Sequence, residues 1–255
     1  MIYNPKDYWE KRLSDKFNLS RVGTLGFSKY YNKFLYKAKI RALKKALLSQ
    51  RINIQDKTVC DIGCGTGFFV DFYHLRGAKD IVGVDITTVS TENLKQKYPQ
   101  YHFIKENVSS PLLVSKVNRQ FDILNAFDVL YHITDDKEFG LGIANICSLT
   151  KDDGFILISD SFGSRSINVA EHVRVRSGET YKATLDENGV KIVEIYPLYY
   201  LLNRPILSMT KIVGLREVGI ILDNLFAPIY YYLDGISLSP GRNNLNLIVA
   251  KKVKP

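Results

Sequence analysis

Three glycines and two carboxylates, spaced along one segment, carry the clearest chemical signal in the chain. Gly63, Gly65 and Gly67 follow an apolar run that contains Asp61, and a second apolar run ends at Asp85. Glycines at alternate positions let the backbone approach a ligand closely, and the helix that follows offers unpaired N–H groups. An acid at the end of the second strand of a βαβ unit can bind ribose hydroxyls. The spacing predicts a site for a nucleotide-containing cofactor.

The spacing also separates two cofactor classes. The dinucleotide fingerprint G-x-G-x-x-G would need a glycine where this chain has Phe68, which disfavours a pyrophosphate-binding turn. The segment 59–69 instead resembles motif I of the class I S-adenosylmethionine-dependent methyltransferases, and the resemblance runs in order from about residue 57 to residue 160.

This resemblance implies roles for particular residues. Asp61 would orient the turn and accept a hydrogen bond from the cofactor's amino group, and Asp85 would bind the ribose. Asn107 stands where the family commonly has an aspartate that contacts the adenine, and its side-chain carbonyl could accept the same bond. The full set of expected cofactor-binding residues is Asp61, Gly63, Gly65, Thr66, Gly67, Asp85, Ile86, Asn107, Val108, Asn125, Phe127, Tyr8 and Trp9. The cofactor would be S-adenosyl-L-methionine and the product S-adenosyl-L-homocysteine.

The elements needed to position these residues fit an α/β fold. We expect a doubly wound, mostly parallel, seven-stranded Rossmann-like sheet, with strands that include 101–106, 154–160, 190–196 and 244–252 and a helix over 176–188. The domain prediction is an N-terminal helical lid (1–50), a cofactor-binding core (51–196), a helical and aromatic cap inserted between the last two strands (197–242), and the final core strand (243–255).

The two ends of the core supply the expected lid and acceptor pocket. Residues 34–50 read as a basic amphipathic helix, either a solvated cover of the sheet or an anion-binding face. The segment 7–12 resembles the helix with which many small-molecule methyltransferases close over the cofactor, although packing on the core would explain it equally well. Tyr199 and Tyr200 are candidates to line an acceptor pocket, against a dimer interface or core cover.

The general base depends on the acceptor. An alcohol gains from a base, whereas a carboxylate needs none. His132 and His172 are the two candidate catalytic bases, with Tyr131, Asp128, Glu171 or no base as alternatives. Tyr131, Arg174 and Arg176 are expected in substrate binding, although the arginines could equally cap a helix or pair with surface acids. No metal site is expected, because the cysteines and histidines are scattered.

Composition narrows the function classes. The chain has 255 residues, a formal net charge of +9, and three cysteines with no disulfide framework. No signal peptide or transmembrane segment is expected, so a cytoplasmic protein is predicted, with a homodimer as a possibility. The predicted function is biosynthetic transfer of a methyl group to a small-molecule acceptor, and the favoured acceptor group is a hydroxyl of a natural product, lipid-like or sugar-containing metabolite. Methylation of RNA or another macromolecule is the runner-up, though no nucleic-acid partner is expected; a non-catalytic cofactor-binding protein and a dehydrogenase are further alternatives.

Overall fold

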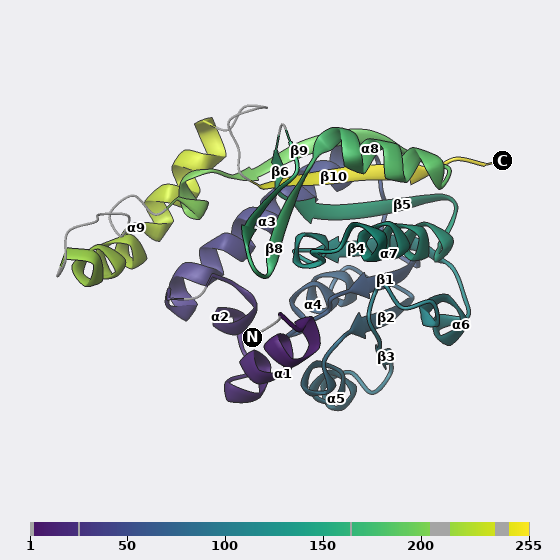
Figure 1. The fold of residues 1–255 in the computed structure, drawn as a ribbon, viewed down its shortest axis with the longest axis horizontal. Helices are drawn as coiled ribbons and strands as arrows, with labels where there is room; N and C mark the ends of the chain where they lie inside the picture. Colours follow the sequence, from purple (N-terminus) through teal and green to yellow (C-terminus); the bar gives the residue numbers. More distant parts are fainter. Residues whose placement is uncertain (1–2, 25, 164, 205–214, 238–244, 255) are drawn as a thin grey trace. The chain divides into compact units, whose positions relative to one another are not determined.

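A seven-stranded sheet forms the centre of the computed structural model, which describes residues 3–24, 26–163, 165–204, 215–237 and 245–254. Its strand order is β3-β2-β1-β4-β5-β10-β9 (Figure 1), and the pairs β3–β2, β2–β1, β1–β4 and β4–β5 are parallel. The strands are β1 (Thr58–Ile62), β2 (Asp80–Asp85), β3 (His102–Lys105), β4 (Phe121–Phe127), β5 (Thr150–Asp160), β9 (Val190–Tyr199) and β10 (Leu245–Lys252). The predicted mostly parallel α/β fold is confirmed.

Helices follow most of the strands, and several of them begin at polar capping residues. They are α1 (Pro5–Asp15), α2 (Leu19–Val22), α3 (Lys29–Ser49), α4 (Phe68–His74), α5 (Thr88–Lys97), α6 (Leu113–Val117), α7 (Asp136–Ser148), α8 (Gly178–Glu187) and α9 (Leu215–Ser237), with 3-10 turns η1 (Leu130–His132) and η2 (Leu201–Asn203). Thr87, Asp135 and Ser177 each accept a hydrogen bond from a backbone N–H in the first turn of the helix that they precede. These local signals fix where α5, α7 and α8 start.

The core lies on the central strands. Leu124, Ile156 and Ile158 of β4 and β5 are completely buried, and α7 contributes Ile143 and Ile146 to the same cluster. Strands covered on both faces read as continuous apolar runs, as these do. Because β1, β2 and β4 are adjacent and parallel, the residues after their carboxyl ends meet at one edge of the sheet.

The chain divides into two compact units. The core unit comprises Met1–Phe17, Asn53–Ile195 and Ile248–Pro255, and the second unit comprises Asn18–Ile52 and Tyr196–Leu247. The segment predicted as one lid, 1–50, is therefore divided, with α1 in the core unit and α3 in the second. Within the second unit α3 packs on α9, where the Arg41 guanidinium donates to the Tyr231 carbonyl at 2.7 Å.

One region differs from the sequence-based prediction. A small additional sheet of β6 (Phe162–Gly163), β7 (Ile167–Ala170) and β8 (Val173–Ser177) occupies residues after β5. The helix expected from residue 176 begins instead at Gly178, because Ser177 caps it, and Arg176 belongs to β8. Residues 205–214 and 238–242 of the predicted cap lie outside the described residues.

Candidate functional site

The glycine-rich turn after β1 adopts backbone conformations that glycine favours. Gly63, Gly65 and Gly67 have φ of +69°, +49° and +78°. At two of these glycines, neighbouring side chains also leave no room for a Cβ atom. A Cβ on Gly63 would lie 2.3 Å from the Val129 side chain, and one on Gly67 would lie 2.5 Å from Leu94. The turn is therefore held between the segment after β4 and helix α5.

Asp61 presents a buried carboxylate oxygen that lacks a hydrogen-bond partner among the described residues. Strand register places Asp61 beside Asn125, whose Nδ2 donates to Oδ1 at 2.5 Å, and the Tyr73 hydroxyl donates to the Asn125 amide oxygen at 3.0 Å. No described group reaches Asp61 Oδ2. Burial raises the pKa of Asp61 to about 7. A ligand ammonium would both satisfy the oxygen and stabilise the ionised carboxylate, so Asp61 fits the amino group of S-adenosylmethionine.

Asp85 fastens the turn to the start of α5. Its Oδ2 accepts from the Gly65 N–H at 2.8 Å, while Oδ1 accepts from the backbone N–H and the hydroxyl of Thr87 at 2.9 and 2.7 Å. Burial raises the pKa of this carboxyl, and these donors oppose the shift. Each carboxylate oxygen can accept two bonds, so Oδ2 keeps one acceptor position for a ribose hydroxyl.

The other expected cofactor residues lie along the same edge of the core unit. Thr66, Ile86 and Asn107 are half-buried, whereas Val108 and Phe127 are buried. Asn107 Oδ1 accepts from the Ser109 N–H at 3.0 Å, and Phe127 packs on Phe69 with ring centroids 4.2 Å apart. Asn125 is itself completely buried and contacts Asp61 and Tyr73, so its part in cofactor binding stays a prediction.

Helix α1 carries Tyr8 and Trp9 onto two histidines. The Tyr8 ring stacks on His172 with centroids 5.1 Å apart, and Trp9 meets His132 edge-on at 4.9 Å. Glu10 accepts from the backbone N–H groups of Thr88 and Val89 at the start of α5, at 2.8 and 3.1 Å. Within the core unit, α1 therefore covers both the histidine pair and the helix that Asp85 helps to cap.

His132 is held in one tautomer. Its Nδ1 lies 2.8 Å from the His172 carbonyl oxygen, and a carbonyl can only accept, so Nδ1 carries the proton and Nε2 keeps its lone pair. Burial lowers the pKa of His132 to about 4, so the ring is uncharged near neutral pH. The two imidazoles lie nearly parallel, 5.8 Å apart. His132 is therefore an uncharged imidazole whose Nε2 can accept a proton.

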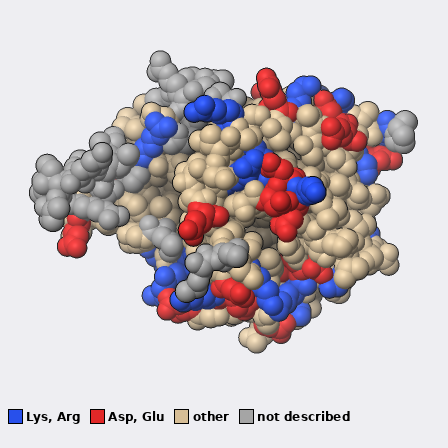
Figure 2. All heavy atoms as spheres, viewed as in Figure 1, with Lys and Arg blue, Asp and Glu red and all other residues tan. Residues whose placement is uncertain are grey.

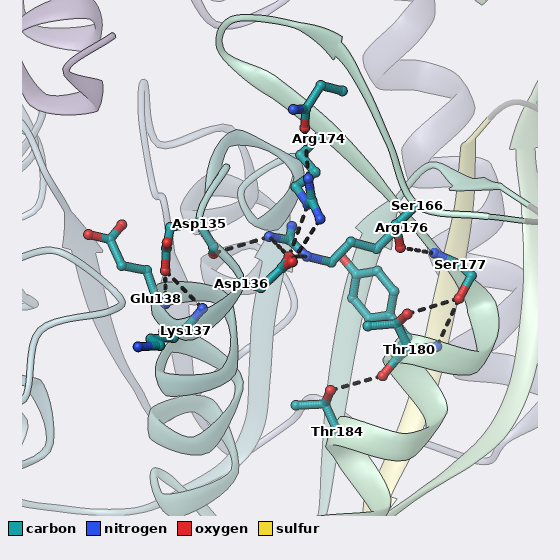
Figure 3. A network of polar contacts seen from close by, with 12 residues as sticks. Asp135, Asp136, Lys137, Glu138, Ser166, Arg174, Arg176, Ser177, Thr180 and Thr184 are labelled. Carbon is teal, nitrogen blue, oxygen red and sulfur yellow. Dashed lines mark hydrogen bonds and ion pairs between the residues drawn. The ribbon is translucent and has the colours of Figure 1, made fainter. Parts of the chain in front are cut away.

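The two predicted substrate-binding arginines both contact Asp136 (Figure 3). Arg174 donates from Nε and Nη2 to the two oxygens of Asp136 at 2.9 and 2.7 Å, and from Nη1 to Asn168 at 3.0 Å. Arg176 is 1% exposed and donates from Nε to Asp136 at 3.1 Å and from Nη2 to the Asp135 carbonyl at 3.1 Å. Of the alternatives for Arg174 and Arg176, the structure therefore shows pairing with an acid, Asp136.

The remaining predicted residues fall in different places. Tyr131 is half-buried beside His132, with ring centroids 4.4 Å apart. Tyr199 and Tyr200 belong to the second unit, where Asp234 accepts from the Tyr200 N–H at 3.2 Å. Their assignment to an acceptor pocket stays a prediction.

Sequence reasoning missed three residues that shape the site. Tyr73 orients Asn125, Glu10 caps α5, and Asp136 binds both arginines. Only Glu10 had a usable signal, because it lies in the segment that resembles a lid. Among the described residues, no cluster suited to a metal ion occurs, and none of their helices is long and apolar enough to cross a membrane.

Comparisons with known proteins agree with this geometry. Residues 31–195 match a family described as a methyltransferase domain. The chain is 29% identical over 133 residues to the tRNA U34 carboxymethyltransferase of Campylobacter fetus, 46% of each protein. It is 26% identical over 98 residues to a ubiquinone biosynthesis O-methyltransferase of Pseudomonas putida, 38% of this chain and 42% of that protein. The matches thus span less than half of these relatives.

Solved structures show the same fold. The magnesium protoporphyrin IX methyltransferase of Synechocystis with bound S-adenosylmethionine aligns with a TM-score of 0.61 at 16% identity, over 97% of this chain and 94% of that one. An O-methyltransferase from a trans-AT polyketide synthase of Brevibacillus brevis, in complex with S-adenosylhomocysteine, gives 0.57 at 17% identity, over 91% and 82%.

Proposed function

The chain belongs to the methyltransferase domain family, as its motif I predicted, and we propose that it transfers a methyl group from S-adenosylmethionine to a hydroxyl group of a small molecule. The observation that carries the choice of a hydroxyl is His132. An imidazole with a fixed Nδ1–H and an Nε2 lone pair can accept the proton that an alcohol must lose, and burial, which lowers the pKa of His132, keeps that lone pair unprotonated at neutral pH.

The residues divide the work between binding and proton transfer. When bound, S-adenosylmethionine supplies an activated methyl group and its own leaving group. Asp61 holds the ammonium, Asp85 takes a ribose hydroxyl, and α1 excludes water above the histidine pair. Nε2 of His132 would accept the proton that the acceptor hydroxyl loses on methylation, while the sulfonium–methyl bond would break and the cofactor would leave as S-adenosyl-L-homocysteine.

The relatives and the surface charge both support a small-molecule acceptor. One relative is named as a ubiquinone biosynthesis O-methyltransferase, which supports a lipid-like or ring-containing acceptor of biosynthetic origin. On the face drawn in Figure 2, basic side chains of the described residues alternate with acidic ones instead of forming a continuous basic surface. A nucleic acid partner favours a clustered basic face. RNA stays the second candidate, because another relative is named for a tRNA nucleotide.

The experiment that tests this function follows the methyl group. The protein is incubated with methyl-labelled S-adenosylmethionine and a lysate of its own source, and metabolites are then separated from RNA and protein. Label in a small metabolite, bonded to oxygen, is the expected result. Label in RNA or protein would reject the small-molecule acceptor. No label with wild type, despite measured cofactor binding, would favour a non-catalytic binding protein.

A further inference from the structure

The hairpin of β7 and β8 touches His132 through its backbone. The connection between the two strands places the His172 carbonyl 2.8 Å from His132 Nδ1, and Val173 directly after it begins β8. The tautomer of His132 therefore depends on where this hairpin turn lies, and the imidazole of His172 takes no part in that bond.

Arg174 fixes the end of β8 nearest the turn. It lies two residues beyond His172, roughly 7 Å along an extended chain. Its bidentate pair with Asp136 joins the hairpin to the first turn of α7, and its third nitrogen binds Asn168 across the hairpin (Figure 3). Because every nitrogen of this guanidinium already donates to protein, Arg174 is poorly placed to grip an acceptor.

The partner of Arg174 is fixed in turn. Asp136 follows the helix-capping Asp135 and lies four residues after His132, so α7 and η1 are joined by a short connection. Arg176, with its guanidinium 4.0 Å from the centre of the Phe139 ring, binds the same carboxylate from the buried side. The Arg174–Asp136 ion pair therefore links α7, which follows His132 in the chain, to β8, which follows His172. The His172 carbonyl in turn contacts His132.

We propose that Arg174 is a positioning residue for His132: by pairing with Asp136 it holds the β7–β8 turn so that the His172 carbonyl keeps His132 in the Nδ1–H tautomer. The inference deepens the proposed function and rests on it for its catalytic meaning. The geometric claim, however, can be measured without any acceptor.

The chain contains a direct reporter of this ring. Trp9, the single tryptophan in the sequence, meets His132 edge-on, and a protonated imidazole quenches indole fluorescence. The groups around His132 that carry charge or titrate are Asp128, Arg12, His172 and Tyr131. A His132→Gln variant therefore identifies which fluorescence transition belongs to His132, and 15N-histidine NMR reports its tautomer.

Arg174→Gln is the test variant, and Arg174→Lys is the conservative variant that should restore the contact in part. Arg119→Gln is the matched control, because Arg119 pairs with Asp80 at the amino end of β2, the end opposite Asp85. Wild type should titrate at a pKa of about 4. In Arg174→Gln the hairpin turn no longer buries the His132 ring as fully. The pKa of His132 should therefore rise by more than about one unit toward the ordinary value of about 6.5, and the ring should populate both tautomers. Arg174→Lys should lie between, and Arg119→Gln should match wild type.

Two results separate the inference from the proposed function. If Arg174→Gln stays folded by circular dichroism and keeps the wild-type tautomer and titration, the positioning role is overturned. If Arg174→Gln shifts both the tautomer and the pKa of His132 while His132→Gln retains full methyl transfer, the positioning role stands and the assignment of His132 as base fails.

Discussion

Replacing Asp61 by Asn should weaken cofactor binding and also change how binding depends on pH. The carboxylate has one oxygen bonded to Asn125 and one buried without a described partner, and burial raises its pKa to about 7. An ammonium placed at that oxygen lowers this pKa, so binding below pH 7 must release a proton. Affinity should therefore rise as the pH rises through about 7, and fall again at higher pH once the ligand's own ammonium loses its proton.

The magnitude follows from the ionised fraction. With a pKa of about 7, roughly one Asp61 in ten is ionised at pH 6, so the dissociation constant for S-adenosylhomocysteine should be about tenfold higher there than on the plateau. A hydrogen bond to a charged group contributes about 1.5–3 kcal/mol, so Asp61→Asn should weaken binding by roughly 10- to 150-fold at neutral pH.

Isothermal titration calorimetry with S-adenosylhomocysteine, which keeps the amino group, measures both effects. Repeating the titration in buffers of different ionisation enthalpy counts the proton released. Asp122→Asn is the matched control, since Asp122 accepts from Thr58 near the amino end of β4, away from the turn. If Asp61→Asn bound with wild-type affinity and the same pH dependence, the reasoning about the buried oxygen would be refuted.

Three further predictions concern other parts of the chain. His132→Gln should lower the rate of methyl transfer to a hydroxyl acceptor by roughly 100-fold or more, and by more than His172→Gln does, with cofactor affinity kept; equal losses would point away from His132. Leu225 and Ile229, 67% and 49% exposed on α9, lie four residues apart on one face; if the chain forms a homodimer through this face, replacing both by Glu should lower the sedimentation coefficient to that of a monomer, whereas an unchanged coefficient excludes that face. Burial raises the pKa of Asp160 to about 8, so the free energy of unfolding should fall as pH rises from about 4 to about 8, and urea titrations of Asp160→Asn should lack this component; an identical slope would contradict it.

The sequence alone determined the fold class, the family and the position of the cofactor turn. These depend on local patterns: the alternate glycines and the acid at the end of β2 lie within about thirty residues, and the apolar strands follow in order to about residue 160. Because parallel strands bring their carboxyl ends to one edge, the closeness of Asp61 and Asp85 follows from the order of elements.

Only the tertiary structure decided which partner each polar side chain meets. Asn125 reaches Asp61 through strand register across 64 residues, and Arg174 reaches Asp136 across 38. The helix expected at residue 176 begins two residues later because Ser177 caps it, and Arg176 belongs to β8, from which it binds Asp136. Periodicity and motif spacing carry no information on such pairings, since each depends on how strands and hairpins pack after distant segments have met. For the same reason, the sequence left His132 and His172 equivalent, and a single backbone carbonyl distinguishes them.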